Sequence, residues 1–519
     1  MQYRSNFIKL LIFSAIIMFC GLTVRELFSG DETRVAGIIA QMSLDHDYVT
    51  PKLNGRPFLE YPPLYYQVGS ICFDLFGFCD AAAKLPSAIS AFAAGLLVFL
   101  LAKQLKFLPD TALCAGVILL TSAQFFNNGR KCMVDMMLAF FILLSVYAFY
   151  TMLKQKKWYW GVGFFLLYAA GLAGGFFTKG LIGIAFPWAG LGIWLVAQDV
   201  LFEKKFSFKR YCLLGSGVLP VLPVVLYWAR ELYLAGGRKA LDTVFMVNGI
   251  GRFSGSQGDH VEPFWYYLEK LPGMFQPWLL IFLGALAFAV YRLRKKQLTS
   301  ELLLLCCCSL SPVLMLHASS AKRQVYMLPV YAFWALLAAE FIVEQRGVYL
   351  EYLRKIKLPV KQIVFVVLLS AAALLFAAGI FFASPDARMI PVAGLLALVA
   401  GAVVRKYRKI MLLSALALLF ASVDAVVLAS KNPAESLRPM YKQCASLLYS
   451  GKQLTLESPA SERTSGGAVF YLRRTLPEVS ADEPLKKNEV RIVRKRDLKG
   501  ENAFADNHFL LEKSAGKRK

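Results

Sequence analysis

The sequence predicts a polytopic α-helical membrane protein with about thirteen membrane-spanning helices, interfacial amphipathic helices and a small C-terminal α/β domain. Of its 519 residues, 57% are hydrophobic and only 18% are charged, whereas a soluble globular chain carries about a quarter charged residues. Apolar runs of about 17–25 residues recur along the chain, and each is long enough to cross a bilayer. A soluble multidomain enzyme, a disordered chain and a fibrous protein are therefore excluded.

The first apolar run resembles a secretory signal peptide, because Arg4 and Lys9 lie at its start. No small-residue cleavage site follows, and Arg25 and Glu26 come next, so we expect an uncleaved first membrane helix. The cores of all the expected spans are residues 7–25, 82–102, 108–126, 132–152, 158–177, 180–200, 211–234, 272–291, 301–318, 323–343, 362–383, 389–404 and 410–429.

The net charge of +24 is concentrated in alternate connections between these spans. Cytoplasmic loops of membrane proteins are enriched in Lys and Arg, so the basic connections are expected inside the cell and need no nucleic-acid partner. This places the N-terminus in the cytoplasm, and an odd number of spans places the C-terminal tail outside. The basic residues include Lys103, Lys106, Lys154, Lys156, Lys157, Lys204, Lys205, Arg292, Arg294, Lys295, Lys296, Arg405, Lys406, Arg408 and Lys409.

Two outer loops are long, at about residues 25–81 and 235–271. Within the first loop, Val35, Ile38, Ile39 and Met42 recur at helical spacing, which predicts an amphipathic helix lying on the membrane. A second interfacial helix is expected at about Pro63–Phe78, where polar residues interrupt an apolar stretch.

The chain divides into a membrane domain, residues 1–430, and a soluble outer domain, residues 431–519. We expect the second domain to be α/β, with strands near Ala468–Leu472 and Glu489–Val493. The ten cysteines form neither a CxxC motif nor a Cys/His cluster and are interpreted as free thiols. No Gly-rich phosphate loop occurs, so no nucleotide cofactor is expected.

Ionisable residues gather at the expected outer ends of the spans, where they can converge on one outward-facing cavity. Carboxylates beside several cations suit a reaction whose leaving group is a phosphate, because cations neutralise that group while an acid acts on the other reactant. Nucleotide sugars and ATP are absent outside the cytoplasm, so an activated donor there must arrive on a lipid carrier. The residues concerned are Asp31, Glu32, Glu60, Arg130, Lys131, Asp135, Lys179, Arg252, Asp259, His260, Glu262, Lys322 and Arg323.

The order of several short motifs resembles the bacterial GT-C glycosyltransferases, namely the lipid A aminoarabinose transferases and their protein-mannosyltransferase-like relatives. The motifs are Asp31-Glu32-Thr33-Arg34, Phe58-Leu59-Glu60 with Pro62-Pro63, Lys84-Leu85-Pro86-Ser87-Ala88, Thr178-Lys179-Gly180, Arg252-Phe253, Pro263-Phe264-Trp265-Tyr266-Tyr267 and Lys322-Arg323-Gln324 with Tyr326. The resemblance covers about residues 5–430 and implies the GT-C fold.

The resemblance also implies residue roles. Asp31 matches the essential acid of the first loop, with Glu32 as its neighbour and Asp135 as a second acid. Lys179 and Tyr326 match positions of the lipid-phosphate pocket, and Lys84, Arg130, Arg252, Lys322 and Arg323 are further candidates for that phosphate. Glu60 and His260 resemble a pair that binds a divalent metal ion. Aminoarabinose transferases usually carry lysine after the glutamate, and Tyr61 stands there instead, which leaves the sugar open.

Simpler interpretations remain for most of these residues. Asp31, Glu32 and Asp135 can favour a helix N-terminus without taking part in catalysis, and Glu60 can pair with a loop lysine. Asp424 lies inside an apolar span with no evident partner, and we expect it to be solvated or hydrogen-bonded to a neighbouring helix.

The predicted function is transfer of a monosaccharide from a polyprenyl-phosphate carrier to lipid A or a related envelope acceptor, with inversion at the anomeric carbon. The candidate sugar is 4-amino-4-deoxy-L-arabinose, and the predicted setting is the periplasmic side of a bacterial inner membrane, with the enzyme as a monomer. A protein O-mannosyltransferase differs mainly in its acceptor. A transporter would place its charges near the bilayer midplane, often in repeated halves, and a non-catalytic scaffold would not need the long first loop.

Overall fold

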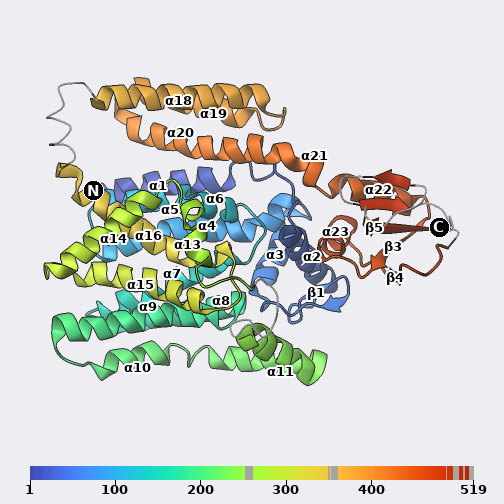
Figure 1. Cartoon of the computed structure of the whole chain (residues 1–519), viewed down its shortest axis with the longest axis horizontal. Coiled ribbons are helices and arrows are strands. Elements are labelled where there is room, and N and C mark those ends of the chain that lie inside the picture. Colours follow the sequence, from blue (N-terminus) through green and yellow to red (C-terminus); the bar gives the residue numbers. More distant parts are fainter. Residues whose placement is uncertain are drawn as a thin grey trace.

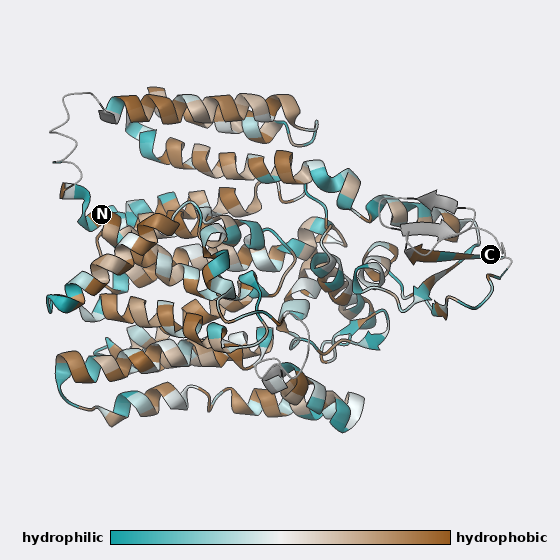
Figure 2. Cartoon of the chain, in the orientation of Figure 1, coloured by the Kyte–Doolittle hydropathy of each residue, from teal (hydrophilic) through white to brown (hydrophobic). Residues whose placement is uncertain are grey.

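The computed structural model describes residues 1–251, 261–348, 351, 360–486, 488–494, 502–505 and 509–512. A bundle of helices occupies one end of the molecule, with the N-terminus at its far side, and a β-sheet occupies the opposite end (Figure 1). Three helices lie between the bundle and the sheet: α2 (Gly30–Asp45), α3 (Leu64–Phe76) and α23 (Glu462–Leu472). Hydrophobic residues predominate along the bundle (Figure 2).

The bundle is built from long apolar helices joined by short connections. Its helices are α1 (Gln2–Phe19), α4 (Asp80–Gln104), α5 (Pro109–Thr121), α6 (Ala123–Gly129), α7 (Asp135–Leu153), α8 (Trp158–Lys179), α9 (Ile182–Gln198), α10 (Phe208–Ser216), α11 (Leu222–Leu241), α13 (Tyr266–Met274), α14 (Leu279–Arg294), α15 (Ser300–Ala318), α16 (Tyr331–Glu344), α18 (Val360–Phe382), α19 (Met389–Val403) and α20 (Arg408–Ser422). Short 3-10 or π-helical segments extend several of them, including the π-helical η2 (Asp242–Gly251) and η5 (Val423–Leu428) and the 3-10 helix η3 (Gln324–Val330).

Within the described residues, 8 helices are long and apolar enough to cross a membrane, or up to 10 if each of two bent pairs counts as one span. The chain is therefore a multi-pass membrane protein. These spans match ten of the thirteen expected ones. The remaining three, at 7–25, 211–234 and 389–404, form helices that fall short of the criteria: α1 begins with polar residues, residues 217–221 separate α10 from α11, and α19 has only 15 residues.

Helix α2 begins because Ser29 caps it, its side chain accepting a hydrogen bond from the Glu32 backbone N–H. The prediction of a helix here is confirmed, but the prediction that its apolar face lies on the membrane is wrong. Val35, Ile38 and Ile39 are buried against α3 and α23. Protein, rather than lipid, covers this stripe, because α23 is supplied by a distant part of the chain.

Helix α3 confirms the second helix predicted in the first loop. Ile71, Leu75 and Phe76 are exposed, and Asp74, which lies among them in the sequence, accepts a hydrogen bond from the Ser43 hydroxyl of α2 at 3.0 Å. The position of this helix at a membrane interface stays a prediction.

The tail contains a mixed five-stranded sheet in the order β4-β3-β5-β7-β6. Strands β4 and β5 run parallel to β3, and β7 runs antiparallel to β5 and β6. The strands are β3 (Gln453–Ser458), β4 (Glu478–Ser480), β5 (Glu489–Arg494), β6 (Asn502–Ala505) and β7 (Phe509–Glu512), and α21 (Asn432–Glu435) and α22 (Arg438–Tyr449) precede them. Strand β5 confirms the strand expected at 489–493.

The strand expected at Ala468–Leu472 is wrong, since these residues belong to α23. Short apolar runs do not distinguish a strand from a helix by periodicity alone. Here Ser461 caps the segment by accepting a hydrogen bond from the Thr464 backbone N–H, and Arg473 ends it in the left-handed conformation.

The tail packs directly on the first outer loop. Gly37 of α2 and Gly466 of α23 bring the two helix backbones into contact, because a Cβ on Gly466 would lie 2.3 Å from the Thr33 carbonyl oxygen. Asn54, between β1 (Lys52–Leu53) and β2 (Arg56–Pro57), donates to the carbonyl oxygen of Leu476 at 2.9 Å and accepts from its N–H at 2.8 Å. The loop and the tail therefore share one packed structure, and a domain boundary at residue 430 stays a prediction.

Candidate active site

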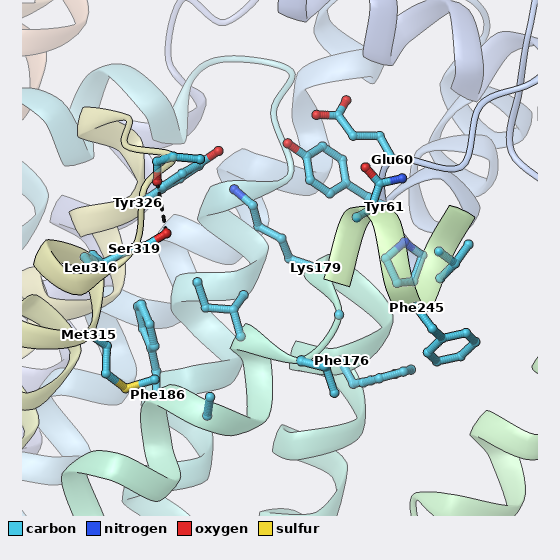
Figure 3. A pocket seen from close by; sticks show the side chains of 18 residues that line it. Glu60, Tyr61, Phe176, Lys179, Phe186, Phe245, Met315, Leu316, Ser319 and Tyr326 are labelled. Carbon is cyan, nitrogen blue, oxygen red and sulfur yellow. Dashed lines mark hydrogen bonds between the residues drawn. The ribbon is translucent and has the colours of Figure 1, made fainter. Parts of the chain in front are cut away.

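A cavity of about 390 Å³ opens beside the first outer loop, between the ends of α8 and α15 and the start of α9. Most of its wall is apolar, and its polar side chains gather near Lys179, Tyr61 and Glu60 (Figure 3). The lining residues are Glu60, Tyr61, Pro62, Phe176, Lys179, Gly180, Leu181, Ile182, Ala185, Phe186, Val244, Phe245, Asn248, Met315, Leu316, Ser319, Ala321 and Tyr326. An apolar wall with one cationic end suits an amphiphile with an anionic headgroup.

Lys179 is the cation of this cavity. It ends α8, where it is 8% exposed and pairs with Asp135, the first residue of α7. Its Nζ lies 4.2 Å from the ring centre of Tyr326 and 5.3 Å from that of Tyr61. Two aromatic faces and one carboxylate thus hold the ammonium group at the cavity wall, and the sequence-predicted residues Asp135, Lys179 and Tyr326 do come together.

Asp31 lies at the head of α2, between two guanidinium groups. Its Oδ1 is 2.9 Å from Arg34 Nη2, and its Oδ2 is 2.5 Å from Arg323 Nη2. Burial alone would raise the pKa of Asp31, but Arg323, Arg34 and Lys179 together lower it below its ordinary 3.8. Asp31 is therefore an ionised and weakly basic carboxylate within electrostatic reach of the cavity's lysine.

Arg34 connects Asp31 to the cavity. Its Nη1 lies 3.3 Å from Glu60 Oε2 and 2.7 Å from Glu462 Oε2, and the guanidinium also packs over the Phe58 ring. Burial would lower the pKa of Arg34, but Glu60, Asp31 and Glu462 raise it instead, so the group stays charged. Glu60 thus pairs with Arg34 of α2, rather than with a loop lysine, and it lines the cavity as well.

Glu32, the neighbour of Asp31, faces the opposite way. It is fully buried and accepts two hydrogen bonds from Arg25, at 3.0 Å and 2.7 Å. Burial alone would raise the pKa of Glu32, but the charge and hydrogen bonds of Arg25 lower it to about 2. Its remaining partners are the Ser29 hydroxyl and the Cys132 backbone N–H.

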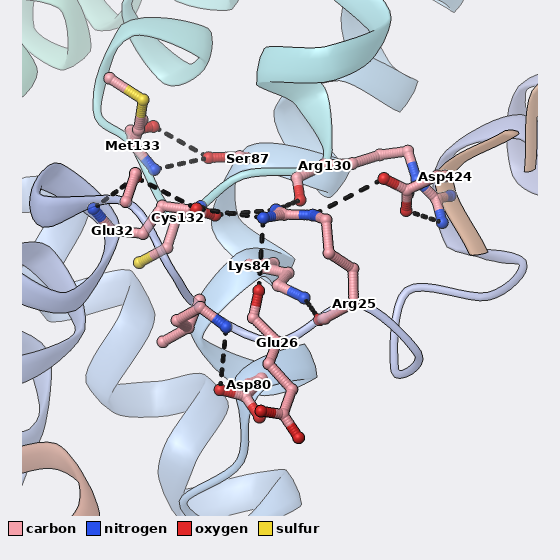
Figure 4. Close-up of polar contacts among 12 residues, drawn as sticks. Arg25, Glu26, Glu32, Asp80, Lys84, Ser87, Arg130, Cys132, Met133 and Asp424 are labelled. Atoms are coloured by element: carbon pink, nitrogen blue, oxygen red, sulfur yellow. Dashed lines mark hydrogen bonds and ion pairs between the residues drawn. The ribbon is translucent and has the colours of Figure 1, made fainter. Parts of the chain in front are cut away.

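Arg25 and Glu32 belong to a buried network that closes the first loop onto the bundle (Figure 4). Asp424 pairs with Arg130 at 2.8 Å and lies 3.6 Å from Arg25. Lys84 donates to the backbone carbonyls of Leu22 and Arg25. We refer to these five side chains, Arg25, Glu32, Lys84, Arg130 and Asp424, as the buried charge network.

The buried charge network changes the interpretation of three predicted residues. Asp424 was expected to be solvated or bonded to a neighbouring helix; it is buried, and Arg25 and Arg130 are its partners. Lys84 and Arg130 were expected to bind a lipid phosphate, but both are fully buried. The other N–H groups of Arg130 donate hydrogen bonds to backbone carbonyls of α1 and of Cys20. Their described contacts hold the loop in place and do not reach the cavity.

Of the other residues predicted to bind phosphate or metal, only Arg323 is placed near Asp31 in the described part of the chain. Arg323 joins the Asp31 cluster, whereas Lys322 donates to the carbonyl oxygens of Glu262 and Ser319 and faces the second loop. Arg252 and His260 lie outside the described residues.

The expected metal pair cannot be assembled from the described part of the chain. There, no group of three or more His, Cys, Asp or Glu residues gathers in a way that could hold a metal ion. Glu60 shares Arg34 with two other carboxylates, and a cation would have to compete with that guanidinium. The described residues do not fit a metal site, and a metal requirement stays a prediction.

Sequence reasoning missed Arg34, Arg25 and Glu462 as members of these clusters. Arg34 had a detectable signal, because it follows Asp31 by three positions and so lies on the same face of a helix. Arg25 and Glu462 had none, since their partners are set by how distant segments pack.

Known proteins resemble the chain in both sequence and fold. The family described as dolichyl-phosphate-mannose-protein mannosyltransferase matches residues 8–233. The crystal structure of ArnT from Cupriavidus metallidurans bound to undecaprenyl phosphate superimposes with a TM-score of 0.72 at 18% identity, covering 97% of each chain. This chain has the fold of that protein. The predicted resemblance to GT-C glycosyltransferases is thereby confirmed.

Curated relatives are named as transferases of the same kind. The undecaprenyl phosphate-alpha-4-amino-4-deoxy-L-arabinose arabinosyl transferase of Aeromonas hydrophila is 30% identical over 327 residues, which are 62% of this chain and 57% of that protein. Its counterpart from Erwinia tasmaniensis is 27% identical over 350 residues, 67% of this chain and 61% of that protein. The chain thus spans about three fifths of the length of these relatives.

Proposed function

We propose that this protein is a membrane glycosyltransferase that moves a sugar from a polyprenyl-phosphate carrier to a lipid acceptor. The observation that carries the proposal is the apolar cavity that ends at Lys179, next to the cluster of Asp31, Arg34 and Arg323. The polyprenyl chain would lie along the apolar wall, with its phosphate near Lys179 and Arg34. The names of the curated relatives support undecaprenyl phosphate as the carrier and 4-amino-4-deoxy-L-arabinose as the sugar. Lipid A is the acceptor that we propose from the resemblance of the sequence motifs.

In the proposed reaction an acceptor oxygen attacks the anomeric carbon as the bond from that carbon to the carrier phosphate breaks. The bonding electron pair leaves with the phosphate oxygen, and in-line attack inverts the carbon. Lys179 and Arg34 neutralise the departing phosphate. Asp31, held ionised between two arginines, stabilises the positive charge that develops on the sugar. A phosphate acceptor is already ionised at neutral pH and needs no base, which suits an acid with a lowered pKa.

The finer topology belongs to the same proposal. We propose thirteen spans, with α1, the α10–α11 pair and α19 completing the ten that meet the length criteria. The basic connections would face the cytoplasm of a bacterial inner membrane, and the cavity, the first loop and the tail would face the periplasm. The position of the N-terminus at the end of the bundle remote from the sheet supports this orientation (Figure 1).

Removing the cavity lysine is expected to weaken binding of the carrier. A Lys179→Met, Asp135→Asn double variant removes the ammonium group without leaving a buried carboxylate unpaired. We expect its kcat/KM for a polyprenyl-phosphate sugar to fall by about 10- to 100-fold, the worth of one charge-assisted contact to a phosphate. Initial rates with purified enzyme in detergent at varied donor concentration provide the measurement.

The matched control for this test is Asp135→Asn alone, which keeps the lysine. A smaller loss in the control than in the double variant supports the assignment of Lys179 to the phosphate. Equal losses in both would contradict it and assign the effect to Asp135.

The pH dependence of transfer should report the ion pair between Asp31 and Arg323. Because the pKa of Asp31 is lowered, its charge persists at neutral pH and is lost only below its ordinary value of 3.8. In Arg323→Gln one cation is gone while the burial of Asp31 remains, so its pKa rises and the acid limb of the rate profile moves to higher pH. Rates between pH 3.5 and 7 measure the shift, with Arg56→Gln as a control; coinciding acid limbs would refute the pairing.

A further inference from the structure

Arg34 is shared by three carboxylates that come from three segments. Asp31 precedes it by one helical turn, Glu60 lies in the loop at the cavity, and Glu462 lies on α23 of the tail. One guanidinium group cannot fully neutralise three carboxylates, although Arg323 and Lys179 also act on Asp31. The three carboxylates therefore compete for Arg34, at the place where an anionic phosphate is proposed to bind.

The three carboxylates differ in how easily they can leave the arginine. The side chain of Glu462 is 54% exposed, whereas those of Asp31 and Glu60 are 26% and 13% exposed. Breaking an ion pair costs little when the released carboxylate can be hydrated at once, and much more when it stays buried. A phosphate that approaches Arg34 would therefore displace Glu462 first.

Glu462 reaches Arg34 because α23 is held firmly against α2. The contact of Gly37 with Gly466 leaves no room for side chains between the helix backbones. Val469 and Phe470, further along α23, lie in one hydrophobic cluster with the core of α2. Glu462 occupies the first turn of α23, next to the capping residue Ser461. Its position is thus set by helix packing, and only its side chain needs to move.

We propose that Glu462 is an internal competitor for the phosphate of the polyprenyl carrier. In the free protein its carboxylate occupies Arg34 Nη1, and the carrier phosphate displaces it into solvent on binding. Glu462 is a positioning residue, because it acts through Arg34 and does not touch the reacting atoms. This inference rests on the proposed function and adds that the tail takes part in donor binding. It also predicts weakened contact between the start of α23 and α2 in the donor complex.

The test compares Glu462→Gln, which removes the charge and keeps the shape, with Glu478→Gln. Glu478 also joins the tail to an arginine of the first loop, Arg56, at 3.2 Å, but it does not contact Arg34. Binding of undecaprenyl phosphate to the purified full-length protein in detergent micelles is measured by tryptophan fluorescence. We expect Glu462→Gln to bind about two- to fivefold more tightly than the wild type, the range of an exposed ion pair, and Glu478→Gln to bind as the wild type does.

Kinetics separate competition from a merely structural role. If Glu462 competes with the donor and leaves Arg34 before the chemical step, removing its charge lowers the donor KM and leaves kcat unchanged. Weaker or unchanged binding in Glu462→Gln would overturn the inference, because it would mean that Glu462 holds Arg34 in place or does nothing to it. Failure of the wild type to bind undecaprenyl phosphate would instead overturn the proposed function, and this inference with it.

Discussion

Replacing Asp31 with asparagine is expected to abolish transfer while leaving the fold intact. The substitution keeps the shape and some of the hydrogen bonds to Arg34 and Arg323, but it removes the charge that stabilises the sugar in the transition state. Removing one preorganised electrostatic group typically costs at least about a hundredfold in kcat. Transfer by purified wild type and variant, measured at saturating donor, checks the loss.

The thermal unfolding of Asp31→Asn should differ little from that of the wild type, because the Asp31 side chain is 26% exposed and Arg34 keeps two other carboxylates. A fully active Asp31→Asn protein would remove the proposed role of this residue. An inactive but unfolded one would mean that the charge supports the structure instead.

Replacing the adjacent Glu32 with alanine is expected to have the opposite effect, a large loss of stability. Its carboxylate is fully buried with Arg25, and removing one partner leaves an uncompensated charge in the interior. Such changes lower the free energy of unfolding by about 3–5 kcal/mol. The measurement is the midpoint of denaturation in detergent, together with the yield of monodisperse protein.

The buried ion pair of Arg25 and Glu32 predicts how stability depends on pH. Since the pKa of Glu32 is lowered to about 2 from an ordinary 4.5, its contribution is present above pH 4.5 and is lost as the pH falls toward 2. The wild type should lose this contribution on acidification, and Glu32→Ala should not. An alanine variant as stable as the wild type, with the same acid sensitivity, would contradict the assignment of Glu32 to the buried charge network.

Much of the fold could be predicted from the sequence because its determinants are local. Ten of the thirteen expected spans, two of them bent helix pairs, are indicated by the length and the apolar composition of the run. The helices of the first loop follow from apolar spacing and from a capping serine. The meeting of Asp31, Asp135, Lys179, Arg323 and Tyr326 could be predicted in outline, since each lies at the outer end of an expected span.

The rest depends on contacts between distant segments. Asp424 pairs with Arg130, which is 294 positions away, so no local pattern can distinguish it from an isolated acid. Lys84 and Arg130 have the composition of phosphate ligands, but packing directs them to backbone carbonyls. The apolar stripe of α2 predicts a face that lies on the membrane, but in the structure α23 packs on α2 through Gly466.

The most direct test of the account is transfer in a defined system. Purified protein is reconstituted in liposomes with undecaprenyl-phosphate-linked 4-amino-4-deoxy-L-arabinose and lipid A, and the lipids are then analysed by mass spectrometry. The proposed reaction predicts lipid A carrying the added sugar and a matching amount of free undecaprenyl phosphate with the wild type, and neither with Asp31→Asn. Unmodified lipid A and intact donor with the wild type would contradict the proposed reaction.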